Sequence, residues 1–88
     1  PDALRADLVK VPHHGSPTSS TAALVEASAA QVAVISCGRA NHFGFPAPGV
    51  EARWAGQVST LLRTDLAGSI TVQIAPSGRM QVSAVEDF

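Results

Sequence analysis

The sequence predicts an α/β fold, in which a mostly parallel sheet carries helices on one face. An apolar run, QVAVISCG at 31–38, is typical of a buried parallel strand. An alanine-rich helical segment precedes it, and a second helical segment and further strands follow. Strand, helix and strand in this order make a βαβ unit. The predicted order over the whole chain is β-α-β-α-β-β-β.

The first half of the chain supplies the βαβ unit. Residues 7–12, DLVKVP, alternate as a strand does, and the strand is expected to end where Pro12 removes a backbone donor. The hydroxyl-rich segment SPTSST at 16–21 offers N-caps for a helix over AALVEASAA, residues 22–30. The buried strand at 31–38 then completes the unit.

The second half is expected to contain a loop, a short helix and three strands. The segment RANHFGFPAPG at 39–49 has no periodicity and predicts a loop, and Pro48 suits the first turn of a helix over 48–57. The segment VSTLLRTD at 58–65 predicts a strand, and alternation within 68–85 predicts an antiparallel hairpin turning at Pro-Ser-Gly. The apolar face of this hairpin comprises Ile70, Val72, Ile74, Met80, Val82 and Ala84.

Residues 1–88 are predicted to form one domain with one uncovered sheet face. A chain of 88 residues with 45% hydrophobic content has room for a single core. Only two helices are available, whereas the run at 31–38 is apolar on both sides. We therefore expect the second face to pack on something missing from this chain or on a second copy of it, as a homodimer.

Composition excludes several classes of protein. The Lys and Arg residues are spread along the chain, and the net charge is −1, so the sequence does not predict an autonomous nucleic-acid binder. No apolar run approaches the roughly 18 residues of a membrane span, and no signal-peptide pattern opens the sequence, so we expect this chain to be soluble. The single cysteine, Cys37, excludes an internal disulfide and is expected to pack as a small hydrophobe.

The stretch VPHHGSPTSS at 11–20 is the strongest candidate for a functional site. His13 and His14 follow a predicted strand end, where neighbouring side chains of an extended segment point to opposite sides. One histidine can then bind a metal while the other donates a hydrogen bond or a proton. The serines lead into a helix N-terminus, which favours an anion such as a phosphate oxygen. Spacing alone nevertheless favours two histidines that cap the strand end, because a zinc site needs about four ligands.

Other possible metal ligands are few. They are His42 in the loop, Asp7 and Asp65 near predicted strand ends, and Cys37. Loop hydrogen bonds, turn capping and packing explain these residues better than metal binding does. The residues alone therefore predict an α/β layer with a partial metal site.

Three segments, taken in order, resemble a known protein family: LVKVPHHGSPTSS, VAVISCGRANHFGFPAPGVEARW and LLRTDLAGSITVQI. Together they resemble the C-terminal part of the metallo-β-lactamase-fold domain of the ComEC family, the DNA-uptake channels of natural competence. HHGS occurs in many hydrolases of that superfamily. Its combination with S-x-GRxN-x-FG-x-P and RTD-x-x-G is much more particular to ComEC. The similarity extends from about Ala6 to about Ile74.

The resemblance implies the second half of a metallo-β-lactamase-like αββα sandwich, whose first half would cover the free sheet face. The main metal motif of the family, H-x-H-x-D-H, belongs to that first half and does not occur in this sequence. The chain is therefore expected to be part of a metal-dependent hydrolase, a DNase domain of a competence protein, and to be inactive as this isolated piece.

The resemblance also assigns residues to the site. His14 corresponds to the closing metal ligand, and His13 to the catalytic neighbour that orients or protonates. Ser16, Ser19 and Asn41 correspond to small polar residues near the same edge and are expected to contact the substrate, with capping of the helix as the alternative role of the two serines. The implied cofactor is divalent zinc or manganese in the intact domain, with weak or no binding by this piece.

The implied partners are DNA and the remainder of the ComEC chain with its membrane channel. That parent would lie in the bacterial inner membrane, with this domain on the periplasmic side, and would degrade the strand that is not imported. Phe45 stands where many relatives carry a histidine, so we infer that this histidine is not an essential ligand. Two alternatives stay open: a half-domain of another hydrolase of the superfamily, and a non-catalytic binding or assembly module.

Overall fold

A three-stranded parallel sheet organises the fold. The structure is a computed structural model, and it describes residues 5–16, 20–39 and 44–86. The strand order is β1-β2-β3, and β2 pairs in parallel with both neighbours. The strands are β1 (Leu8–Lys10), β2 (Val32–Ile35) and β3 (Thr60–Arg63). The central place of β2 matches its near-continuous apolar sequence, as predicted, and the small α/β fold is confirmed.

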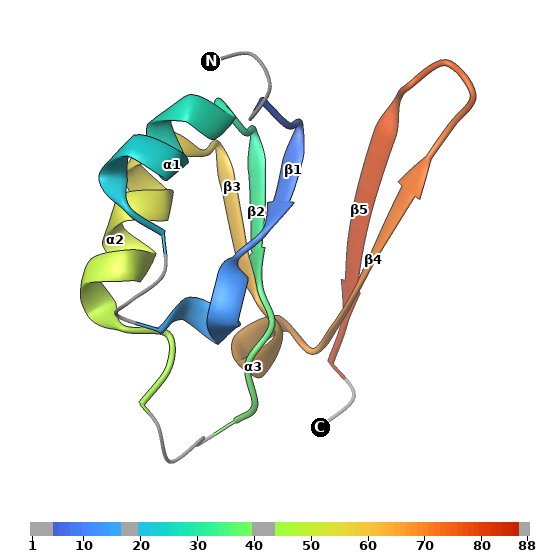
Figure 1. Ribbon diagram of the computed structural model, residues 1–88. Coiled ribbons are helices and arrows are strands. Elements are labelled where there is room, and N and C mark those ends of the chain that lie inside the picture. The colour runs from blue at the N-terminus through green and yellow to red at the C-terminus, as the bar shows by residue number, and fades with distance from the viewer. Residues whose placement is uncertain (1–4, 17–19, 40–43, 87–88) are drawn as a thin grey trace.

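Two helices, α1 (Ala22–Ser28) and α2 (Pro48–Gln57), lie on the same face of this sheet (Figure 1). Each connects neighbouring parallel strands, and successive crossovers of one hand across a sheet place their helices on one side. The N-cap of α1 is Thr21, whose hydroxyl accepts the Leu24 N–H at 3.2 Å. Both helices lie at the predicted positions.

The core lies between these helices and the sheet, with Trp54 at its centre. Trp54 is 0% exposed, and its indole N–H donates to the Ser20 hydroxyl at 2.9 Å. Arg53 donates to the Ser20 carbonyl at 2.6 Å, so α2 holds the segment that leads into α1. The buried residues of this cluster are Val11, Val25, Ala33, Ile35, Val50 and Trp54.

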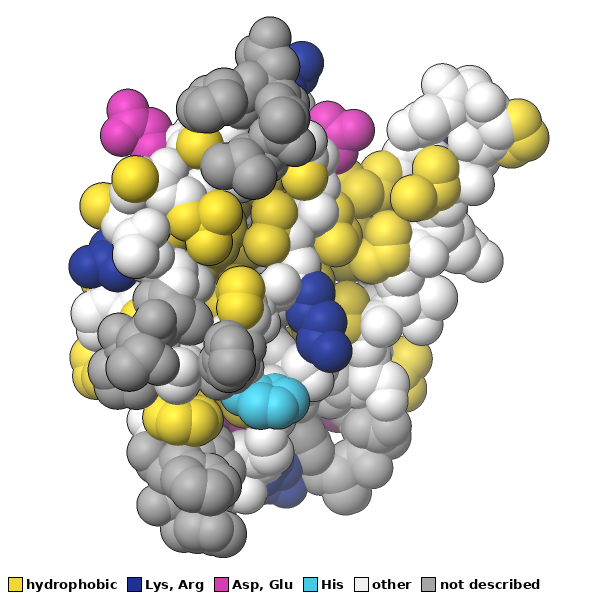
Figure 2. Space-filling view, in the orientation of Figure 1, with side chains coloured by type: hydrophobic (Ala, Val, Ile, Leu, Met, Phe, Trp, Pro, Cys, Tyr) yellow, Lys and Arg dark blue, Asp and Glu magenta, His cyan; other side chains and the backbone are white. Residues whose placement is uncertain are grey.

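The predicted hairpin forms, but as a separate sheet. Strands β4 (Ser69–Ile74) and β5 (Met80–Val85) pair only with each other within the described residues. The prediction of a single, mostly parallel sheet was therefore wrong, because the hairpin forms a second sheet. The hairpin stands on the side of the parallel sheet opposite the helices (Figure 1), and apolar side chains gather between them (Figure 2).

The hairpin covers the second sheet face only in part. Val72 and Met80 are half-buried, as is Leu8 on the facing strand, whereas Ile74 is 72% exposed. The expectation that this face has no partner within the chain was thus too strong, because the hairpin covers part of it.

The helices in the described ranges lack the length and apolar character needed to span a membrane.

Two short helices were not predicted. A 3-10 helix, η2 (Pro12–Gly15), contains both histidines, so the argument from an extended segment does not apply to them. The helix α3 (Thr64–Ala67) begins inside the stretch predicted as a strand at 58–65. The helix η2 is separated from the end of β1 by one residue, and α3 follows β3 directly, so both lie at the carboxyl edge of the parallel sheet.

Replacement of Trp54 by alanine tests the core. Trp54→Ala removes the largest fully buried side chain together with its bond to Ser20. We expect the free energy of unfolding to fall by about 3–5 kcal/mol, measured by urea denaturation. Gln57→Ala, at an exposed position of the same helix, should change it by less than about 0.5 kcal/mol. Equal effects of the two variants would contradict a core centred on Trp54.

Candidate functional site at the carboxyl edge of the sheet

The carboxyl ends of the three parallel strands lead into segments rich in polar groups. Strand β1 leads into η2 with His14, β2 into Ser36 and Cys37, and β3 into α3. Figure 1 shows η2 and α3 at the same end of the sheet. Ligands of open α/β sheets bind at this edge, because the strand-to-helix loops converge there.

His14 is held with one ring nitrogen engaged. Its Nδ1 lies 2.6 Å from the carbonyl oxygen of Ser36. A carbonyl can only accept, so Nδ1 carries the proton and, in the neutral ring, Nε2 carries the lone pair. The side chain is exposed. This is the arrangement of a metal-binding histidine, whose second nitrogen usually donates to a carbonyl or carboxylate.

The backbone at His14 turns sharply to make this contact. His14 has φ 55° and Gly15 has φ 82°, both in the left-handed region. A Cβ added at Gly15 would lie 2.5 Å from the Cβ of Pro46, and the Ala47 N–H donates to the Gly15 carbonyl at 2.8 Å. Position 15 therefore requires glycine for both conformation and space.

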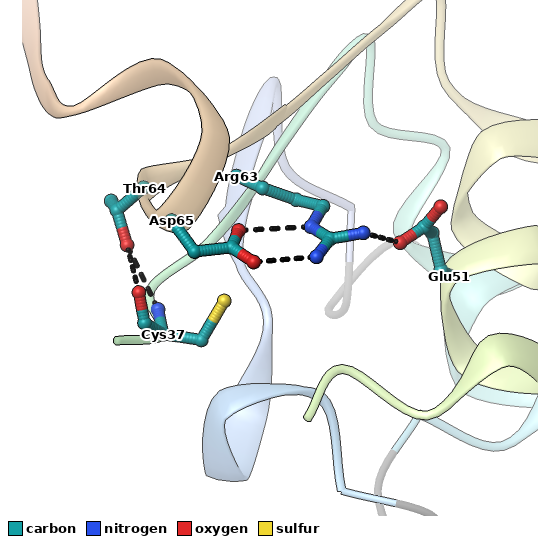
Figure 3. Close-up of polar contacts among 5 residues, drawn as sticks. All are labelled: Cys37, Glu51, Arg63, Thr64 and Asp65. Carbon is teal, nitrogen blue, oxygen red and sulfur yellow. Dashed lines mark hydrogen bonds and ion pairs between the residues drawn. The ribbon is translucent and has the colours of Figure 1, made fainter. Parts of the chain in front are cut away.

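A charged cluster lies between β3, α3 and α2 (Figure 3). Arg63 donates to both carboxylate oxygens of Asp65, at 2.9 and 2.5 Å, and it also pairs with Glu51. The Arg63 guanidinium holds the pKa of Asp65 below its ordinary value, and Asp65 in turn raises the pKa of Arg63. Because Arg63 is occupied by two carboxylates, its charge is not available to a phosphate.

Cys37 is half-buried and packs against the core, as the sequence predicted. Burial raises the pKa of its thiol, and the hydrogen bond and negative charge of Asp65 raise it further. At neutral pH the group is therefore mainly the neutral thiol and not the nucleophilic thiolate.

The predicted site residues divide into two groups. His14 is at the edge with Nε2 available, and Ser16, directly after η2, is buried with 8% exposure. Ser19, Asn41 and the side chain of His13 lie outside the described residues. The catalytic, metal-binding and substrate-binding roles assigned to these residues stay predictions.

Sequence reasoning missed the polar contacts beyond β3. Asp65 was considered as a possible metal ligand and, in preference, as a turn cap, and no role was assigned to Thr64, Arg63 or Glu51. Their signal was the RTD triplet at the end of a predicted strand, since carboxyl ends of parallel strands meet at one edge.

A complete metal site is not assembled by the described residues. Within them, no three of the His, Cys, Asp and Glu side chains gather in a way that could hold an ion. His14 fits a metal as a single ligand only. A cleft of about 640 Å³ lies between the hairpin and the amino ends of β1 and β2, and is lined in part by Asp7, Gln31 and Met80. It is at the opposite end of the strands from His14.

Comparison with known proteins identifies relatives of this chain. It is 35% identical over 75 residues, 85% of its length, to competence protein ComA of Neisseria gonorrhoeae. Identity and coverage are the same for the uncharacterized protein YcaI of Escherichia coli K12. The matched stretch is 11% and 10% of these proteins, so the chain spans about a tenth of their length. These matches support a relationship to the ComEC family. No family model and no solved structure matches the chain.

The Arg63–Asp65 pair makes stability depend on pH. The folded pKa of Asp65 is depressed, so its stabilisation is complete above the unfolded value of about 3.9 and is lost as pH falls through the folded value. At pH 7, Asp65→Asn should lower the free energy of unfolding by about 2 kcal/mol. The difference in urea midpoint between this variant and the wild type should shrink progressively as pH falls below about 3.9, the unfolded value. A difference that stays constant with pH would contradict an ionised Asp65 as the source. The exposed Asp7→Asn serves as the control at pH 7.

Proposed function

We propose that this chain is part of a DNA-uptake protein and that His14 supplies one ligand to the divalent metal of its hydrolytic domain. The main support for this proposal is the similarity to competence protein ComA over 85% of the chain. The geometry of His14 supports it, because a histidine anchored through Nδ1 offers Nε2 to an ion. The ComEC-type combination of HHGS, GRxN and RTD motifs points the same way.

The proposed reaction is hydrolysis of a phosphodiester bond in DNA. Zinc or manganese, when bound, supplies a water of lowered pKa and offsets charge on phosphate oxygens. Within this chain, His14 holds the ion through Nε2, and the Ser36 carbonyl fixes the orientation of the ring. His13 orients this ligand or carries a proton, and Ser16, Ser19 and Asn41 contact the substrate. The remaining ligands belong to a first half-domain that carries H-x-H-x-D-H.

Half of a metallo-β-lactamase-like αββα sandwich is the architecture that we propose for this chain within the longer protein. Helices cover one face of the parallel sheet, and the hairpin covers the other only in part. A first half-domain would complete that second face. Apolar burial of this kind favours association of the two halves by about 25 cal/mol for each Å² removed from water.

We propose that other parts of the longer protein attract the DNA and direct it to this domain. This chain has a net charge of −1, and Arg63 is engaged by Glu51 and Asp65. A phosphate backbone is attracted by clustered positive charge. We therefore propose that the membrane channel, placed in the inner membrane, delivers the strand that is not imported to this domain on the periplasmic side.

Substitution of His14 in the longer protein tests the proposal. The protein should bind zinc or manganese and degrade single-stranded DNA. We expect His14→Ala to lower metal affinity and DNase activity by about tenfold or more, as loss of a ligand or its support does. Metal binding is measured by calorimetry and degradation by release of labelled nucleotides. His42→Ala serves as the matched histidine control and should retain both properties.

Three outcomes separate this proposal from its alternatives. Metal binding unchanged by His14→Ala would contradict a ligand at position 14. Metal-dependent hydrolysis of other phosphoesters without cleavage of DNA would favour another hydrolase of the superfamily. Neither metal binding nor hydrolysis by the longer protein would favour a binding or assembly module. For the 88-residue chain alone, we expect weak or no metal binding.

A further inference from the structure

The hydroxyl of Thr64 binds the backbone of Cys37 at two points (Figure 3). It accepts the Cys37 N–H at 2.8 Å and donates to the Cys37 carbonyl at 2.9 Å. A hydroxyl has one proton and two lone pairs, so a single oxygen can make both bonds. The last backbone pair of β2 and β3 is Ile35 with Arg63, because the chain turns into α3 at Thr64. The Thr64 side chain thus extends the connection between the two strands beyond their ladder.

The bonded N–H belongs to the same peptide group as the carbonyl that contacts His14. The Cys37 nitrogen and the Ser36 carbonyl form one peptide unit, which is planar and rigid. Thr64 binds its N–H, and His14 donates to its oxygen at 2.6 Å. Rotation of this peptide would weaken both bonds together. A hydrogen bond at the N–H also polarises the carbonyl and strengthens the bond that the carbonyl accepts.

We propose that Thr64 is a positioning residue for His14 and acts through the Ser36–Cys37 peptide. By holding the peptide, Thr64 keeps the Ser36 oxygen directed at Nδ1 of His14. The proton then stays on Nδ1, and Nε2 keeps its lone pair. This inference rests on the proposed function, since a bare Nε2 is what a metal ligand requires, but Thr64 itself contacts neither metal nor substrate in this role.

The backbone of Thr64 is held independently of its hydroxyl. Arg63, the preceding residue, pairs with Glu51 and Asp65. The Gly68 N–H donates to the Thr64 carbonyl at 3.0 Å and closes the single turn of α3. Removal of the hydroxyl therefore leaves the contacts that position residue 64 in place, and its effect on His14 can be measured separately from the fold.

The tautomer of His14 tests the proposal directly. The ¹⁵N chemical shifts of its ring nitrogens are measured in the 88-residue chain at about pH 8, above the ordinary imidazole pKa of about 6.5, and His14→Gln assigns the signals. The wild-type chain should show a proton on Nδ1. Thr64→Val removes both hydrogen bonds and should shift the tautomer ratio toward Nε2–H by about fivefold, as expected for one weakened bond. Thr64→Ser keeps the hydroxyl and should stay near wild type.

Three results would overturn the proposal. They are a wild-type His14 protonated mainly on Nε2, a folded Thr64→Val with an unchanged ratio, and a Thr64→Ser that shifts the ratio as much as Thr64→Val does. Circular dichroism establishes that each variant is folded. If Thr64→Val does not fold, the first result still decides, and Thr64→Ala takes the place of Thr64→Val in the other two. These measurements use neither metal nor DNA, so a failure here is distinguishable from a failure of the proposed hydrolase.

Discussion

The central strand β2 is the constraint on which the structure depends. It is hydrogen-bonded to β1 on one side and β3 on the other, and Ala33 and Ile35 are 0% exposed beneath the helices. A slip of this strand by one residue would exchange its two faces and would move Ala33 and Ile35 out of the core beneath the helices. That register determines where β2 ends, and Ser36 and Cys37 therefore emerge at a fixed place beside β1 and β3.

Hydrogen bonds and ion pairs hold the segments together beyond the end of β2, where the apolar core ends. Beyond Ile35, the His14 ring and the Thr64 hydroxyl both bind the backbone of residues 36–37, and the Arg63 guanidinium binds Glu51 and Asp65. No buried side-chain nitrogen or oxygen within the described residues lacks a hydrogen-bond partner. Satisfied networks of this kind favour a single arrangement, because each lost partner would leave a desolvated group. The carboxyl edge is thus ordered by hydrogen bonds and charge, whereas the opposite edge borders an open cleft.

The sequence predicted the elements that have a periodic spacing of apolar residues. It missed the features that depend on contacts between residues distant in the chain. Periodicity located β2, both longer helices and the hairpin, because burial of one face imposes a spacing on the residues. It could not show that the hairpin leaves the parallel sheet, since alternation is the same in either sheet. The 3-10 turn at His14 depends on the close approach of Gly15 to Pro46, 31 residues away in the chain. The contact of Thr64 with Cys37 likewise joins residues 27 apart, and no local pattern encodes such a pair.

The junction at Gly68 determines how the hairpin is attached. Gly68 has φ 82°, and a Cβ there would lie 2.1 Å from the Val85 carbonyl oxygen, so the two ends of the hairpin close tightly over this glycine. At the other end, Ile74 is 72% exposed and the turn borders the cleft. We therefore expect amide protons near Pro76 to exchange with solvent through local opening more readily than those of β2, the central strand of the parallel sheet.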